Sequence, residues 1–368
     1  MNTLDAFHEL RDALAAAEPA ADDTAGGPEE DARRARTLAA VLADAHALTR
    51  LDPGLLLADL LADPRRWPEQ DWENYFGNAS ITVIRTETLR VDVLYWLQNA
   101  STLHKHVSPG AFLALSGRRM HLEYAFDSPA ALGSGVTFGG LSALGRTMMR
   151  DAAVSPILPT MVHELYWIEK PSVTVSIRCT PRTGTAGHGA AGQPPHRPHE
   201  FIPPGTAYLP AAFQETSNIQ RWTDGLALLR RANRDLYLRT LGTALRLVDA
   251  LHLLHVVDEM CDNPAEEVSD LLARADAERE DDAVARLLPS VPEFRRRKIF
   301  SRLHIGGGAT QLLAALLWAG AQGGELATLL KAEKVTDPDA FVRDHGERLC
   351  ARDPRVKPYV DEAGRSLR

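Results

Sequence analysis

The most distinctive chemical feature of the sequence is a pair of histidines, His104 and His106, inside residues 102–107 (TLHKHV). The β-branched and apolar neighbours predict a strand, in which residues two apart point to the same face. The two imidazoles would then project together, as the arms of a metal chelate must. His163, in a later predicted strand (161–168), is the best candidate for a third ligand. Three neutral imidazoles would leave positions on a divalent metal open for a substrate or dioxygen.

Other clusters of polar residues are weaker candidates, and an HxH pair can itself arise by chance on a strand face. His121 and Glu123 are also two apart on one predicted strand and could support a metal ligand, but we expect a solvated strand face. On a predicted helix, His252, His255 and Asp258 follow one another at three-residue spacing, which resembles half of a carboxylate-bridged metal site. No second Glu-x-x-His motif accompanies them, so ordinary helix contacts are the expectation.

The elements that must position these residues change character twice along the chain. Residues 1–77 carry apolar residues at three- and four-residue spacing and predict a helical region. Residues 78–210 contain short β-branched and aromatic segments between turn residues, which favours an antiparallel sandwich or small barrel over βαβ units. Residues 216–368 are again helical in pattern. The sequence therefore predicts an α+β fold. The expected strands are 80–86, 90–97, 102–107, 111–116, 119–126, 161–168 and 172–179.

Two stretches of the predicted β region are rich in glycine, serine or proline. Residues 132–145 are expected to form a flexible loop, and residues 181–210 to form a long loop that is either disordered or a lid. A third unusual stretch, the basic run Arg295-Arg296-Arg297-Lys298, is expected to form a solvated helix face. Contact with an acidic partner is the weaker alternative for that run.

Composition narrows the class of protein. The 368 residues carry 41 Lys+Arg against 49 Asp+Glu, a formal net charge of −8, with 45% hydrophobic residues. These values are typical of a globular chain, and the acidic balance argues against a nucleic-acid binder. No apolar run is long enough for a membrane span, and the N-terminus lacks the basic start of a secretory signal. Three widely spaced cysteines without a CxxC pair suit a reducing cytoplasm and leave a metal to His, Asp or Glu.

Residues 93–126 (VLYWLQNASTLHKHVSPGAFLALSGRRMHLEYAF), with HEL at 163–165 and PSVTVS at 171–176, resemble the cysteine dioxygenase family of cupins. The shared order is an apolar strand, the HxH pair, a short turn, a second apolar strand, a glycine turn and the third-histidine strand. The resemblance implies a double-stranded β-helix (cupin) barrel, a mononuclear Fe(II) held by three histidines, and oxidation of a small substrate by O₂. The ligands it implies are His104, His106 and His163.

The sequence departs from that family at three positions. Ala111 stands where cupins often carry a glutamate ligand and where thiol dioxygenases of the animal type carry the cysteine of a Cys–Tyr crosslink. Counting from Pro171, Ser176 and Arg178 stand where the family has an outer-sphere histidine and tyrosine. Retained ligands with changed surroundings are what a different substrate on the same metal would require.

The remaining candidate residues are predicted to line the pocket. Tyr95 and Ser176 are the candidate catalytic residues. Arg178, or Arg85 on the first strand, is expected to bind an anionic group of the substrate, because a guanidinium suits bidentate capture of a carboxylate. Trp167 is four residues from His163 and shares its face, so it is a candidate substrate contact. The alternatives are plain barrel core for the aromatics and a surface position for the arginines.

We therefore expect a cytoplasmic, mononuclear non-heme Fe(II) oxygenase that oxidises a small, amino-acid-like or anionic substrate with O₂, with no nucleic-acid or membrane partner. Two alternatives stay open: a thiol dioxygenase with altered surroundings of the metal, and a non-catalytic metal-binding cupin that serves as a sensor or interaction module. The C-terminal helices could contact a protein partner, close over the barrel or form a homo-oligomer interface.

Overall fold

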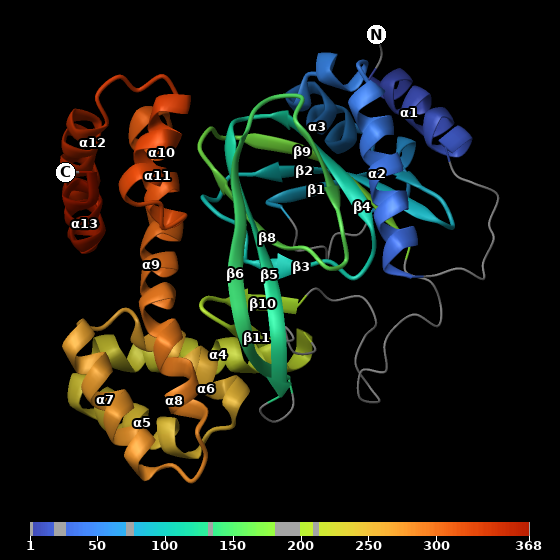
Figure 1. The fold of residues 1–368 in the computed structure, drawn as a ribbon. Coiled ribbons are helices and arrows are strands. Elements are labelled where there is room, and N and C mark those ends of the chain that lie inside the picture. Colours follow the sequence, from blue (N-terminus) through green and yellow to red (C-terminus); the bar gives the residue numbers. More distant parts are fainter. Residues whose placement is uncertain are drawn as a thin grey trace.

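A computed structural model gives the arrangement of the chain (Figure 1). The structure describes residues 3–17, 27–70, 77–131, 135–180, 199–208 and 213–367. Along these residues helices come first, strands occupy the middle, and helices return, so the predicted α+β class is confirmed.

Three helices form the N-terminal layer: α1 (Thr3–Ala17), α2 (Pro28–Asp44) and α3 (Pro53–Ala62). The start of α3 is set locally, because the Asp52 carboxylate accepts hydrogen bonds from the backbone nitrogens at the first turn and Pro53 has the fixed φ that a helix start tolerates. The apolar faces of these helices pack on one face of the first β-sheet, where they bury a shared core. The opposite face of that sheet carries Leu94, Trp96 and Phe112, so both faces are largely apolar.

The strands account for residues 79–208. Every strand expected from the sequence overlaps an observed one, and four more are present. In chain order they are β1 (Ala79–Arg85), β2 (Leu89–Trp96), β3 (His104–Lys105), β4 (Gly110–Ser116), β5 (Arg119–Ala131), β6 (Val136–Met149), β7 (Val154–Ile157), β8 (Val162–Trp167), β9 (Ser172–Cys179), β10 (His199–Ile202) and β11 (Thr206–Tyr208).

Strand order identifies the barrel. The first sheet runs β1-β2-β9-β4-β7, and the second runs β10-β11-β6-β5-β8-β3 and closes on itself. If β1 and the β10–β11 hairpin are set aside, the eight strands β2 to β9 form the pair of sheets β2-β9-β4-β7 and β3-β8-β5-β6, all antiparallel. This is the order of the double Greek-key jelly roll, the architecture of the cupins. The expected double-stranded β-helix is confirmed.

The flexible loop expected at 132–145 is wrong for residues 136–145, because β6 begins at Val136 and pairs with β5 in a long hairpin that reaches down to the level of α4 (Figure 1). Residues 132–134 lie outside the described residues. Two glycines in and beside this hairpin allow backbone segments to approach closely. A Cβ on Gly139 would lie 2.4 Å from the Asp127 carbonyl oxygen, and one on Gly205 would lie 1.8 Å from the Gly139 carbonyl oxygen. The long loop expected at 181–210 contains the β10–β11 hairpin, while residues 181–198 lie outside the described residues.

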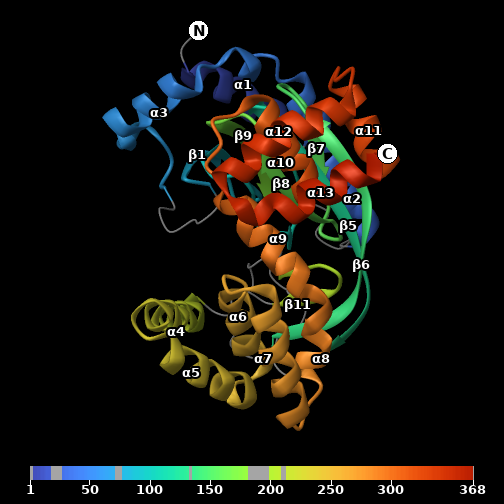
Figure 2. The same ribbon diagram turned by 90° about the vertical axis from the view of Figure 1, so that its left-hand side faces the viewer.

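The C-terminal helices form two groups joined by α9 (Val291–Arg302), which Figure 2 shows between the lower and the upper group. The lower group packs around its own core, and the upper group covers the outer face of β5 and β8. Each helix in the described ranges is too short or too polar to cross a bilayer. The lower group is α4 (Phe213–Ala232), α5 (Arg234–Leu247), α6 (Ala250–Met260), α7 (Ala265–Glu278) and α8 (Ala283–Leu287), and the upper group is α10 (Gly308–Trp318), α11 (Gly323–Ala332), α12 (Pro338–Arg352) and α13 (Lys357–Leu367).

The basic run at 295–298 is not the solvated helix face that the sequence suggests. Arg297 forms a bidentate ion pair with Glu164 of β8, which is fully buried and also accepts a hydrogen bond from the Tyr124 hydroxyl at 3.0 Å. Lys298 is buried and lies 3.4 Å from Asp258. An isolated buried charge is costly, so these partners explain why α9 can carry its charges into the junction between barrel and helices.

Candidate metal centre

Three histidines meet inside the barrel. His104 begins β3, His106 follows β3, and His163 lies opposite His104 in the pairing of β3 with β8. All three are buried, with at most 4% of each residue exposed, and one ligand nitrogen from each lies within 4.8 Å of the others. The Nε2 atoms of His106 and His163 are 2.9 Å apart. That separation is close to the roughly 3 Å expected between adjacent nitrogen ligands when each metal–nitrogen bond is about 2.1 Å.

Hydrogen bonds to the far side of two rings determine which nitrogen can bind a metal. Nδ1 of His104 lies 2.8 Å from the carbonyl oxygen of Thr102, and a carbonyl only accepts, so Nδ1 of His104 carries the hydrogen. Its Nε2 then presents a lone pair. Nδ1 of His163 lies 2.9 Å from Nε2 of His121. Both rings therefore offer Nε2 toward the cluster, which is the arrangement that a metal requires.

The electrostatic environment keeps these ligands uncharged. Burial lowers the pKa of His104 to about 4 and lowers the pKa values of His106 and His163 well below the ordinary 6.5. The positive charge of Arg178 also contributes to the lowering at each of the three. Neutral imidazole is the form that coordinates metal, so the residues present fit a mononuclear metal ion.

His121 belongs to this site, a position that the sequence offers only as the weaker alternative. It is 2% exposed, its Nε2 faces His163, and its Nδ1 lies 3.5 Å from Oε1 of Glu123. The expected solvated strand face is therefore wrong for His121, whereas the Glu123 side chain is 39% exposed. The HxE spacing on one strand was the available signal. What the spacing could not show is that this face of β5 points into the barrel.

Ser176 and Arg178 face the same interior. Thr174, two residues earlier on β9, accepts a hydrogen bond from the buried Trp96 indole, and the alternation of a strand puts Ser176 and Arg178 on that face as well. Ser176 is buried opposite Phe112, whose ring centroid lies 6.2 Å from that of His163. The barrel wall beside the histidines is thus polar on β9 and aromatic on β4.

Trp167 lies in the barrel interior, fully buried, with its ring stacked on Trp96 at a centroid separation of 4.3 Å. The two indoles belong to a core cluster that also contains Phe112 and Leu165. The structure therefore places Trp167 on the inner face that the sequence predicts for it. A substrate contact by this ring stays a prediction.

Tyr95 and Arg85 lie elsewhere. The Tyr95 hydroxyl donates to the carbonyl oxygen of Pro53 at 2.6 Å, and the ring packs in the core beneath the N-terminal helices. This corrects the expectation that Tyr95 lines the pocket. Arg85 ends β1, the edge strand of the first sheet, and its guanidinium lies 3.9 Å from Glu69. Of the two candidate arginines, Arg178 is the one whose positive charge contributes to the lowered pKa of His104.

Ala111 also faces outward, into the core shared with the N-terminal helices. The inward positions of β4 beside it are Gly110 and Phe112, because side chains alternate along a strand. A Cβ on Gly110 would lie 2.3 Å from the carbonyl oxygen of Ile177, so this position has no room for a side chain. Neither a carboxylate nor a thiol stands on this part of β4.

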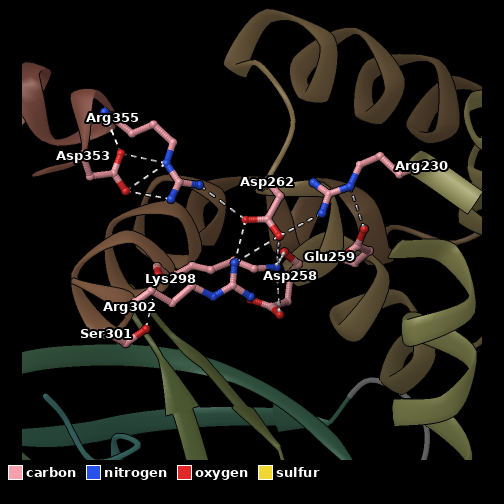
Figure 3. A network of polar contacts seen from close by, with 9 residues as sticks. All are labelled: Arg230, Asp258, Glu259, Asp262, Lys298, Ser301, Arg302, Asp353 and Arg355. Carbon is pink, nitrogen blue, oxygen red and sulfur yellow. Dashed lines mark hydrogen bonds and ion pairs between the residues drawn. The ribbon is translucent and has the colours of Figure 1, made fainter. Parts of the chain in front are cut away.

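A concave region outside the barrel lies between α4, α6, α9 and the short helix η4 (Pro354–Val356), with a volume of about 440 Å³. Figure 3 shows cationic side chains converging there on Asp262. The Asp262 carboxylate lies 2.9 Å from Arg302, 3.3 Å from Arg230, 3.4 Å from Lys298 and 3.6 Å from Arg355. Because these charges are paired with one another, the network joins the helices and does not need a ligand to balance it.

The histidines of α6 make ordinary contacts. His252 pairs with Asp249 at 2.9 Å, and the His255 ring packs edge-on against Tyr208. Within the described ranges, His104, His106 and His163 form the one group of three or more candidate ligands close enough to share a metal.

The fold and the site thus define a cupin-type barrel with a buried three-histidine centre. No family model matches the sequence, and no curated protein matches it. Among solved structures, the chain is similar to a hydroquinone 1,2-dioxygenase in complex with Cd²⁺ and 4-hydroxybenzonitrile, at 12% identity over 30% of this chain and 68% of that one, with a TM-score of 0.24.

Two further solved structures are similar to this chain to about the same extent. The hydroquinone 1,2-dioxygenase from Sphingomonas sp. TTNP3 with 4-hydroxybenzoate bound is 14% identical over 30% of this chain and 70% of that one, with a TM-score of 0.23. A cupin-2 domain protein from Shewanella frigidimarina is 11% identical over 33% of this chain and 92% of that one, with a TM-score of 0.20. Similarity at this level decides nothing about fold or function. Those conclusions rest on the strand order and on the side chains.

Proposed function

We propose that the protein is a mononuclear non-heme Fe(II) oxygenase of the cupin type, with the metal held by His104, His106 and His163. The observation that carries this proposal is the convergence of three buried, uncharged imidazoles, two of which have Nδ1 hydrogen-bonded on the side away from the cluster and Nε2 turned toward it. Three protein ligands leave positions for small molecules. Fe(II) is preferred here on the resemblance to three-histidine cupin dioxygenases that residues 93–126 show.

Fe(II) bound there would supply the electron transfer and dioxygen chemistry that side chains cannot perform. The chain's own residues orient the reactants and keep bulk water out. The Thr102 carbonyl holds the His104 ring by its Nδ1 hydrogen, and the burial of all three ligands limits access of solvent to the centre. Phe112 provides an apolar wall against which the body of a small substrate can pack.

We further propose that Arg178 binds an anionic group of the substrate and that Ser176 forms a hydrogen bond with it. Both lie on the interior face of β9, and the charge of Arg178 acts on all three histidines. A guanidinium offers two parallel donors to a carboxylate, which fixes its orientation as well as its position. A small carboxylate or amino acid is the substrate class that this wall favours.

The test is oxygen consumption by the Fe(II)-loaded protein against a panel of small carboxylates, amino acids and thiols. We expect consumption with at least one carboxylate. Replacement of Arg178 by glutamine should then raise KM about tenfold or more with a smaller change in kcat, because the lost contact is made in the ground state too. A KM that stays unchanged in Arg178→Gln would contradict the assignment of Arg178.

The same panel separates the alternatives. Consumption with thiols alone would favour a thiol dioxygenase with altered surroundings of the metal. Stoichiometric metal binding without consumption of O₂ on any substrate would favour a sensor or interaction module. The oxygenase is preferred because polar groups on β9 face the same interior as the metal ligands.

A further inference from the structure

We propose that His121, backed by Glu123, is a positioning residue of the metal centre: it fixes His163 in the form that carries hydrogen on Nδ1 and holds the ring at its coordinating angle. This inference rests on the proposed metal site. It assigns a role to a buried histidine that the three-ligand description leaves unused.

The geometry is a chain of three side chains that leads outward from the metal ligands. Nδ1 of His163 lies 2.9 Å from Nε2 of His121, and the two rings are almost perpendicular, at 84° with centroids 5.1 Å apart. Nδ1 of His121 lies 3.5 Å from Oε1 of Glu123, which is ion-pair distance but longer than an ordinary hydrogen bond. His121 is 2% exposed, so its ring nitrogens need hydrogen-bond partners inside the barrel, and His163 is one of them.

The direction of the hydrogen bonds between His163, His121 and Glu123 depends on whether Nε2 of His163 binds a metal. If Nε2 of His163 binds a metal, its Nδ1 must carry the hydrogen and donate it to Nε2 of His121. A neutral His121 that accepts at Nε2 then carries its own hydrogen on Nδ1, which faces Glu123. Glu123 ends the chain as an acceptor when it is ionised. The three groups are therefore consistent with only one direction of donation.

Packing and register keep His121 in place. His121 and Glu123 are two apart on β5, and Glu123 lies opposite His163 in the pairing of β5 with β8, so His121 is the diagonal neighbour of His163. The Phe112 ring meets the His121 ring edge-on at a centroid distance of 5.5 Å.

A purely structural role is the competing account, in which His121 only fills the barrel and satisfies its neighbours. The two accounts differ in what happens to the metal. A partner that fixes the tautomer and ring angle of a ligand typically changes metal affinity by about 10- to 100-fold when it is lost. A residue that only packs changes stability without changing the coordination of the metal.

The experiment compares His121→Asn with His121→Gln in the full chain. Both are polar amides, but only the glutamine oxygen reaches as far as Nε2 of the histidine and can still accept from His163. The readouts are the dissociation constants for Fe(II) and Co(II), from competition with a chelator, and the visible absorption spectrum of the Co(II) protein. His252→Gln is the control, since His252 pairs with Asp249 on the surface of α6.

We expect His121→Asn to weaken metal binding about 10- to 100-fold and to change the Co(II) spectrum, and His121→Gln to stay within a few fold of the wild-type protein. Equal affinity and equal spectra for His121→Asn and the wild-type protein would overturn this inference alone. So would equal weakening by the asparagine and glutamine variants. A wild-type protein that binds neither metal would overturn the proposed function, and this inference with it.

Discussion

Nδ1 of His104 and Nδ1 of His163 are each occupied by a hydrogen bond, and this leaves Nε2 of both rings as the atom that faces the cluster. The partners differ in kind: one is a backbone carbonyl that cannot change its role, and the other is the side chain of His121. A backbone partner is present in any sequence that keeps the fold. A side-chain partner makes the site sensitive to a single substitution.

The lowered pKa values of the buried histidines predict how stability depends on pH. Burial lowers the folded-state pKa of His104 and of His121 to about 4, whereas an unfolded histidine titrates near 6.5. Between those values the unfolded chain binds more protons, so the free energy of unfolding of the metal-free protein should fall as pH drops from 7 to 5. The limit is roughly 1.4 kcal/mol per histidine per pH unit. Urea unfolding at several pH values measures it, and a flat profile over this range would contradict the burial of these groups.

For single residues, the sequence predicts which side chains are candidates for the site better than it predicts which way they point. The HxH pair points to His104 and His106 because the alternation of side chains along a strand is enough to place both imidazoles on one face. Tyr95 is misplaced because β2 is apolar on both faces: Val91 and Val93 face the N-terminal helices with Tyr95, while Leu94 and Trp96 face the barrel. When a sheet is covered on both sides, hydrophobicity does not tell which face is inside.

The two faces of strand β8 make different contacts, one with the histidine cluster and the other with helix α9. His163 points into the barrel, and the next residue, Glu164, points to the helices and is held by Arg297 of α9. The position of the metal ligand is therefore tied to the packing of α9 on the barrel. Asn99 strengthens the same junction, since its amide nitrogen donates to the carbonyl oxygens of Phe300 and Leu303 at 3.0 and 2.5 Å.

Removal of Arg297 should destabilise the protein strongly. Arg297→Met leaves the fully buried Glu164 carboxylate without its cation, for which the typical cost is about 3 to 5 kcal/mol. The double variant Arg297→Met with Glu164→Gln should recover part of that loss, because no unpaired charge is left behind. Urea unfolding measures both. Arg343→Met is the control, since its exposed partner Asp344 makes a weak surface pair, and equal effects of Arg297→Met and the control would contradict the account.

Glycine obscured strand β6 in the sequence, and charge obscured the buried setting of helix α9. Residues 136–149 form β6 although glycine and serine argued for a loop, because Gly139 allows β6 to approach β5 and the turn at Gly205 closely. Helix α9 was expected to be solvated because Arg297 and Lys298 are charged. Their acidic partners come from β8 and from the region of α6, which no local pattern reveals.

In the whole molecule the barrel lies between two layers of helices (Figures 1 and 2). The N-terminal helices cover the first sheet, and α10 with its neighbours covers the second, where Met120, Leu122 and Tyr166 share a core with the helices. Neighbouring helices thus complete the hydrophobic core outside the barrel. The domain limits predicted at 77/78 and between 210 and 216, and a protein partner or oligomer formed through residues 216–368, stay predictions.

The Asp262 network predicts how the two groups of C-terminal helices hold together (Figure 3). Burial alone would raise the pKa of Asp262, but the charges of Lys298, Arg302 and Arg230 hold it below the ordinary value. Asp262→Asn should lower the free energy of unfolding by roughly 2 kcal/mol, because several cations lose their shared partner. The exposed Asp339 provides the control variant Asp339→Asn. Equal unfolding midpoints in urea for the two variants would argue against a structural role of the network.

The metal content of the purified protein tests the central claim most directly. The wild-type chain, His163→Ala and the control His252→Ala are loaded anaerobically with Fe(II), dialysed and analysed for metal, with circular dichroism to verify folding. One metal ion per chain is expected in the wild-type protein and in His252→Ala, and close to none in His163→Ala. A folded wild-type chain without bound metal, or a His163→Ala chain that retains the full amount, would contradict the assignment of His104, His106 and His163 as a metal centre.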